Sequence, residues 1–165
     1  MGHKRLRFVV LIAAATIFAV ACGGTTGGGT PTKTFKIGLV TDIGGLNDKS
    51  FNHLADVGLE KAKTDFKIQG DVKESKSGDD YVPNLTDFAS KKYDLVIGVG
   101  FLMAEAVGTV SGQFPKINFA IIDGAGTDSK GNDLKHTNVQ SLFFKEQDAG
   151  AMVGVIGRAS CRERV

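Results

Sequence analysis

Apolar and polar positions follow two different periods along the chain between residues 36 and 156. Short apolar runs rich in β-branched residues are typical of buried strands, and such runs lie at Lys36–Thr41, Asp71–Glu74 with its flanks, Tyr93–Val99, Lys116–Asp123 and Asn138–Phe144. Between them, apolar residues spaced three and four apart predict four helices. The first is capped by Asn47 and has Phe51, Ala55, Leu59 and Ala62 on its inner face, and the second is capped by Asp79 and Asp80 and has Val82, Leu85, Phe88 and Ala89 there. The third covers Leu102–Gly112 with Met103, Ala106, Val107 and Val110 inward, and the fourth starts at Lys145 with Ala149, Met152, Val153 and Ile156 inward. Strands and helices that alternate through short connections predict an α/β fold with a parallel sheet and right-handed crossovers.

The first strand and the helix after it frame a candidate ligand site. Two glycines, Gly44 and Gly45, break the apolar run and predict a tight turn between strand and helix. In open α/β sheets, ligands bind beyond the carboxyl ends of the strands. The residues at that end of the first strand are Asp42, Asn47, Ser50 and Phe51.

Two acidic residues hold equivalent positions in this pattern. Asp42 and Asp123 are each the first acid after an apolar strand. A carboxylate at such a position can accept two hydrogen bonds from the neighbouring hydroxyls of a sugar, or it can cap a helix or loop. Phe51 has two interpretations as well, as an aromatic platform in a cleft or as a core residue of the first helical turn.

The start of the chain predicts a bacterial secretion signal. Basic residues precede the apolar run Phe8–Val20, which is short for a membrane span and suits a signal-peptide core. Small residues then lead to Cys22, as in the lipobox where a signal is cut before a cysteine that is then lipidated; Ala19 stands where leucine is usual. The alternative is an uncleaved anchor helix. Residues 22–35, rich in Gly and Thr, predict a flexible tether.

Composition and motifs exclude several other classes of site. The net charge is +2, but the basic residues at the two ends account for it, and the mildly acidic body has no basic stripe for nucleic acid. The only cysteines are Cys22 and Cys161, so a cysteine metal site is not expected between them, and His53 and His136 are far apart in sequence. No complete phosphate-binding fingerprint and no nucleophile or acid–base pattern is found, so we expect no metal, no cofactor and no catalytic residue.

Five segments lie in order between Lys36 and Val155: VTDIGGLNDKSFN, ESKSGDDYVPNL, YDLVIGVGFLMAEAV, FAIID and VQSLFFKEQDAGAMVGV. Together they resemble one known family, the basic membrane proteins, also called PnrA-like or Med-like. Proteins of that family are substrate-binding lipoproteins of ABC importers, and many bind nucleosides. The loop Gly124–His136 departs from the family in being longer and more polar.

The resemblance implies a fold and a role for several residues. The family fold is the type I periplasmic binding protein, with two Rossmann-like lobes that close on the ligand around a hinge. By resemblance, Asp42 would hold ribose hydroxyls, Phe51 would stack on the base, and Asp123 would add a second ribose contact. Gly100 and Phe101 would line the cleft where the backbone comes close to the ligand. The implied partners are a nucleoside or related solute, an ABC permease, and the cell membrane, to which the protein is lipid-anchored on its extracytoplasmic face.

The signal features and the family resemblance together predict how the chain is divided. Residues 1–21 would be the lipoprotein signal peptide, 22–35 the tether, 36–144 the first lobe and 145–155 the start of the second lobe. The last ten residues, IGRASCRERV (156–165), carry three arginines after a body that has none. They also look like the translation of a common sequencing adapter, so we expect them to be an artefact and not native protein.

Two other function classes remain open from the sequence. A ligand-sensing receptor lipoprotein would use the same lobes and the same export signal. A nucleoside-processing α/β enzyme is less favoured, because the sequence offers no general base beyond lone aspartates.

Overall fold

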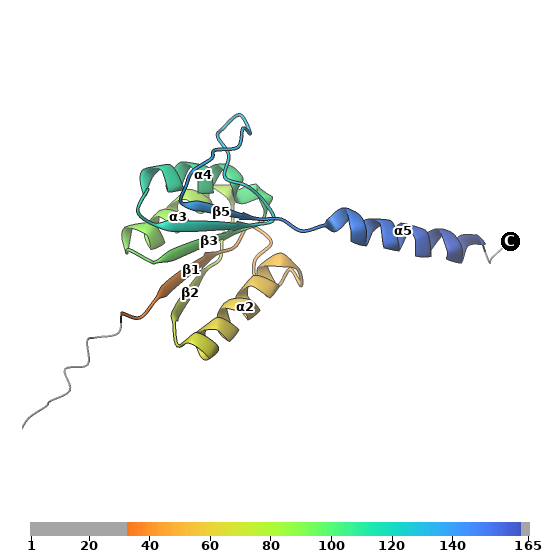
Figure 1. Ribbon diagram of the computed structural model, residues 1–165, viewed down its shortest axis with the longest axis horizontal. Helices are drawn as coiled ribbons and strands as arrows, with labels where there is room; N and C mark the ends of the chain where they lie inside the picture. The colour runs from red at the N-terminus through yellow and green to blue at the C-terminus, as the bar shows by residue number, and fades with distance from the viewer. Residues whose placement is uncertain (1–32, 163–165) are drawn as a thin grey trace, which may run out of the picture. The chain divides into compact units, whose positions relative to one another are not determined.

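Residues 33–162 are described in the structure, a computed structural model, and within them the chain forms a five-stranded parallel sheet. The strand order is β2-β1-β3-β4-β5 (Figure 1). The strands are β1 (Lys36–Val40), β2 (Gln69–Lys73), β3 (Leu95–Val99), β4 (Asn118–Ile122) and β5 (Val139–Leu142). The predicted α/β fold with a Rossmann-like parallel sheet is therefore confirmed. The predictions for residues 1–32, which include the signal peptide and Cys22, lie outside the described residues.

Helices cover both faces of the sheet (Figure 1). α3 and α4 lie on one face and α2 on the other, and each side has its own cluster of buried apolar side chains. The helical elements are α2 (Phe51–Phe66), η1 (Gly78–Asp80), α3 (Tyr81–Ser90), η2 (Phe101–Met103), α4 (Ala104–Gln113) and α5 (Glu146–Arg162). For residues 159–162 of α5 the backbone alone is described.

The larger core lies between the sheet and the α3–α4 pair. Met103, Ala106, Val107 and Val110 are buried there, as the helical spacing predicts. One predicted core position of α3 is wrong, because Val82 is 38% exposed and Tyr81 is the buried residue of the first turn. Since α3 is preceded by the 3₁₀ turn η1, its inward face begins one residue earlier than the apolar spacing suggests.

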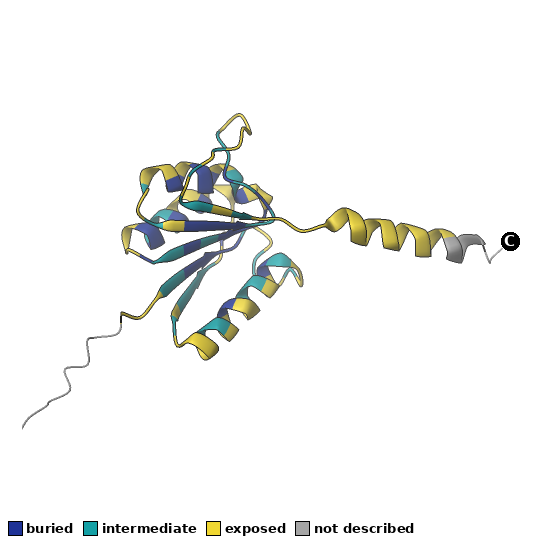
Figure 2. Cartoon of the chain, viewed as in Figure 1, coloured by how far each residue is buried: buried dark blue, intermediate teal, exposed yellow. Residues whose placement is uncertain are grey.

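The end of the sequence forms a helix whose described side chains are exposed. Along α5 every described residue is exposed, including the predicted apolar stripe (Figure 2). Met152, Val153 and Ile156 are 63–70% exposed. No helix within residues 33–162 combines the length and hydrophobicity needed to cross a bilayer.

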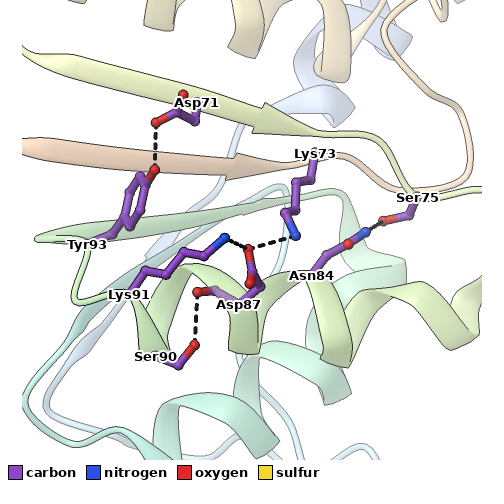
Figure 3. A network of polar contacts seen from close by, with 8 residues as sticks. All are labelled: Asp71, Lys73, Ser75, Asn84, Asp87, Ser90, Lys91 and Tyr93. Carbon is purple, nitrogen blue, oxygen red and sulfur yellow. Dashed lines mark hydrogen bonds and ion pairs between the residues drawn. The ribbon is translucent and has the colours of Figure 1, made fainter.

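A polar network ties the edge strand β2 to the elements beside it (Figure 3). The Tyr93 hydroxyl donates to Asp71 Oδ2 across 2.6 Å, and Lys73 and Lys91 both pair with Asp87 Oδ2 at 2.8 Å. Burial and the Asp71 hydrogen bond raise the pKa of Tyr93 to about 12. The same hydrogen bond lowers the pKa of Asp71.

Candidate ligand-binding site

The candidate site lies at the carboxyl edge of the three central strands β1, β3 and β4. Because the strands are parallel neighbours, the residues after their last positions meet at one edge of the sheet. Asp42 follows β1, Gly100 follows β3 and Asp123 follows β4. The Gly100 amide donates to Ile122 O across 2.8 Å, which places the end of β3 directly beside the end of β4.

Asp42 is held with one carboxylate oxygen occupied. Its Oδ1 accepts hydrogen bonds from the Gly44 amide at 2.8 Å and from Asn52 Nδ2 at 2.7 Å. The Asp42 amide donates in turn to Asn52 Oδ1 at 3.2 Å. Within residues 33–162, the other oxygen, Oδ2, accepts no hydrogen bond from the protein. Asp42 therefore keeps the acceptor capacity that recognition of a ligand hydroxyl requires.

The free oxygen of Asp42 faces Gly100. A Cβ atom built on Gly100 would lie 2.7 Å from Asp42 Oδ2. Gly100 also has φ +92°, a conformation that side chains disfavour. Glycine is therefore required at this position for two reasons, the positive φ angle and the lack of space for a side chain beside the Asp42 carboxylate.

The loop between β1 and α2 is also tied to the α3 side of the sheet. The Ile43 amide donates to the Tyr81 hydroxyl across 3.3 Å. Burial raises the pKa of Tyr81, and the nearby Asp42 carboxylate acts in the same direction. The phenol is therefore held in its neutral form beside the candidate site.

The start of α2 differs from the prediction. The sequence predicts Asn47 as the cap of this helix, which is wrong. The helix begins at Phe51, so Ser50 holds the N-cap position, and the carboxylate of Asp48 accepts the hydrogen bonds of the first backbone amides. Burial tends to raise the pKa of Asp48, but hydrogen bonds from the amides of Ser50, His53 and Asn52 outweigh it and lower that pKa. Asn47 and Ser50 are exposed at the rim of the candidate site.

Phe51 lies between the apolar core and a groove. It packs against the core cluster of Leu39, Leu59 and Val99. Its ring also meets that of Phe144 at a centroid distance of 5.4 Å and an angle of 44°. The two rings line an apolar groove of about 480 Å³, together with Leu54, Ala55, Ile122, Lys145, Glu146 and Ala149.

The remaining predicted residues lie at the same edge of the sheet. Phe101 is 67% exposed. Asp123 has φ 61° and its amide donates to Leu142 O at 2.8 Å. Burial raises the pKa of Asp123, and the neighbouring Glu146 raises it further through charge repulsion and a hydrogen bond. Among the described residues, no cluster of His, Cys, Asp or Glu has the arrangement of a metal site.

Two functional candidates were missed by the sequence reasoning. Asn52 and Asp48 fix Asp42 and the helix start, yet the sequence marks them only as polar residues near a helix end. One signal in the sequence was available for Asn52. Asparagine is unfavourable in helices and rarely buried, so an asparagine between the apolar positions of a predicted helix suggests that its side chain has a polar partner.

The chain matches the family described as ABC transporter substrate-binding protein PnrA-like over residues 35–163. The chain belongs to this family. Family members are substrate-binding proteins of ABC transporters, so the expectation of a binding protein in place of an enzyme is confirmed.

Relatives in this family agree with that placement. An uncharacterized lipoprotein of Pyrococcus abyssi is 36% identical over 145 residues, covering 85% of this chain and 34% of the relative. The ABC transporter nucleoside-binding protein BmpA of Lactococcus lactis is 31% identical over 160 residues, covering 92% of this chain and 44% of the relative. The chain thus spans less than half the length of these relatives.

A solved structure supports the fold of the PnrA-like chain. A solute-binding protein of an ABC transporter system from Aeropyrum pernix K1 superposes with a TM-score of 0.66 at 29% identity. The match covers 74% of this chain and 32% of that structure.

Proposed function

We propose that the chain is the first lobe of a nucleoside-binding lipoprotein that serves an ABC importer. In this proposal the Asp42 carboxylate accepts hydrogen bonds from ribose hydroxyls, Phe51 stacks on the base, and Asp123 adds a second ribose contact. Asn47, Ser50, Gly100 and Phe101 complete the rim.

The observation that carries the proposal is the free oxygen of Asp42. A carboxylate whose Oδ1 is fixed by two donors and whose Oδ2 accepts no hydrogen bond within residues 33–162 suits a ligand that brings hydroxyl donors. Hydrogen bonds to a charged acceptor are stronger than those between neutral groups. The apolar groove beside Phe51 presents the rings of Phe51 and Phe144 at the same edge.

The family supports the coarser part of the proposal, and one relative supports the finer part. Substrate-binding proteins of ABC transporters deliver solutes to a membrane permease, and the Lactococcus lactis relative is named as nucleoside-binding. The Pyrococcus abyssi relative is named as a lipoprotein, in agreement with the lipobox ending at Cys22. We propose Cys22 as the lipidation site, which would hold the protein on the extracytoplasmic face of the membrane. In the division that we propose, residues 36–144 form the first lobe and 145–155 begin the second.

Calorimetry on the full-length protein tests this proposal. We expect nucleosides to bind with a dissociation constant of about 1 µM or tighter, near −8 kcal/mol. Phe51→Ala should weaken binding by roughly tenfold or more, since stacking contributes about 1–3 kcal/mol per base. Asp42→Asn should weaken ribonucleosides more than free bases. Unchanged affinity in Phe51→Ala removes the stacking role, and equal losses for nucleoside and base remove the ribose role.

A further inference from the structure

Asn52 is a buried polar residue whose side chain forms hydrogen bonds with Asp42 and Asp48 at the candidate site. It is 2% exposed and lies in the first turn of α2, next to Phe51. Burial of an amide is costly unless each of its polar atoms finds a partner. Its Nδ2 donates to Asp42 Oδ1 at 2.7 Å and to Asp48 Oδ2 at 3.1 Å, and its Oδ1 accepts from the Asp42 amide at 3.2 Å.

These contacts determine the orientation of the amide. Two carboxylate oxygens face the nitrogen and one backbone N–H faces the oxygen. The reversed amide would set an oxygen against two carboxylates and leave the N–H of Asp42 against an NH₂ group. Only one orientation therefore satisfies all three partners.

Asn52 thereby decides which oxygen Asp42 offers to a ligand. It binds both the Asp42 backbone amide and the carboxylate oxygen Oδ1. Rotation of the carboxylate would break the bonds that Oδ1 accepts from Asn52 Nδ2 and from the Gly44 amide. Oδ2 is left toward Gly100, where a Cβ atom would lie only 2.7 Å from it. Fixing an acceptor before binding reduces the entropy lost when the ligand arrives.

We propose that Asn52 is a positioning residue of the ligand site, which acts through Asp42 and does not itself touch the ligand. This inference rests on the proposed function for the identity of the ligand. The geometric part, that Asn52 fixes the Asp42 conformer, stands independently of any ligand.

The test compares Asn52→Ala with a matched structural asparagine in the full-length protein. Asn138 Nδ2 donates to three backbone carbonyls, those of Ser111, Phe114 and Ile117, next to the start of β5 and at the other edge of the sheet. Asn138→Ala therefore removes a comparable amide anchor away from Asp42. The ligand probes are adenosine and 2′,3′-dideoxyadenosine, which lacks the neighbouring 2′ and 3′ hydroxyls of the ribose.

We expect Asn52→Ala to weaken adenosine by about tenfold or more, the scale of one hydrogen bond to a charged group, and to leave dideoxyadenosine nearly unchanged. Asn138→Ala should leave the ratio of the two affinities at its wild-type value. Because Asn52 acts through Asp42, Asn52→Ala should add little to the loss already caused by Asp42→Ala. A folded Asn52→Ala protein with the wild-type ratio overturns the inference.

A second variant and a ligand-free measurement complete the test. Asn52→Asp keeps the size of the side chain but loses the donor to Asp42, and we expect the same loss of discrimination. Crystal structures of the ligand-free variants should show Asp42 turned away from its wild-type conformer. An Asp42 carboxylate that keeps its place in both variants refutes the positioning role. If the wild type binds neither probe, the proposed function fails and the Asp42 conformer alone decides the role of Asn52.

Discussion

Gly100 faces the Asp42 carboxylate in a backbone conformation that other residues rarely adopt. The sequence placed it at a strand end, since it follows the apolar run that became β3. That a side chain is excluded there could not be predicted, because the exclusion comes from Asp42, 58 positions away in the chain. How closely two strand ends approach each other depends on the pairing register of the strands, which the local pattern of apolar and polar residues does not determine.

We predict that Gly100→Ala impairs both folding and binding. The new Cβ would meet Asp42 Oδ2 at 2.7 Å, and φ +92° strains any residue with a side chain. The expected loss of unfolding free energy is about 1–3 kcal/mol, measured by urea denaturation, with a larger loss of ligand affinity by calorimetry. Gly58→Ala is the matched control, since a Cβ there meets nothing within 4 Å. Because Gly58 lies in the interior of α2, Gly58→Ala should raise the free energy of unfolding by about 0.5–1 kcal/mol. Equal stability of the two variants contradicts the role assigned to Gly100.

The positions of two acidic residues in the fold could be predicted from the sequence, because each follows an apolar strand. Asp42 and Asp123 were identified as acids that follow apolar strands, and the structure places both strand ends at one edge of the sheet. Asn52 was missed because its importance arises from two partners, Asp42 and Asp48, that a linear pattern does not connect. Asn47 was wrongly chosen as a cap because Asn and Asp have similar capping propensities, and only the turn geometry selects Asp48.

At the scale of elements, apolar periodicity predicted the strands and helices to within a few residues. β2 was the least accurate, since Gln69–Lys73 is an edge strand with intermediate burial and a weak apolar pattern. β2 pairs with β1 along its whole length, and polar side-chain contacts, among them the Tyr93–Asp71 hydrogen bond of Figure 3, add to this attachment. Such side-chain contacts leave no periodic signal in the sequence.

We predict that the Tyr93–Asp71 contact makes stability fall at high pH. The pKa of Tyr93 is raised to about 12, above the value of about 10 for an unperturbed tyrosine. Folding therefore favours the protonated phenol, and this contribution is complete below about pH 10 and lost as the pH rises to about 12. Urea midpoints measured between these pH values should decline in the wild type and decline less in Tyr93→Phe. Identical slopes in the two proteins contradict the prediction.

At the scale of the whole molecule, the alternation of strands and helices was enough to predict the fold class. The family resemblance extended that prediction to a lobe of a binding protein, and the match over residues 35–163 confirms the family. The stripe of α5 could be read as apolar from the sequence, but its exposure could not, since exposure depends on which surfaces pack against the helix and the described residues leave Met152, Val153 and Ile156 uncovered.

We predict that Cys22 anchors the protein to the membrane through acyl chains. Each buried methylene contributes about 0.8 kcal/mol, so two or more chains give stable attachment. Cys22→Ser should release the protein into the soluble fraction or leave it unprocessed, as fractionation and mass spectrometry of the N-terminus would show. A Cys22→Ser protein that is cut and retained as in wild type refutes the lipid anchor.

The hydrogen bond from the Ile43 amide to Tyr81 also has an optical consequence. The chain has no tryptophan and two tyrosines, so its intrinsic fluorescence comes from Tyr81 and Tyr93. Tyr81 reaches the turn that carries Asp42, whereas Tyr93 donates to Asp71 beside the edge strand. Within these 165 residues, the tyrosine emission of Tyr93→Phe would come from Tyr81 alone. Tyr81 is thus an intrinsic fluorophore that is hydrogen-bonded to Ile43, the residue next to the Asp42 carboxylate, and it can report on this turn without any attached dye.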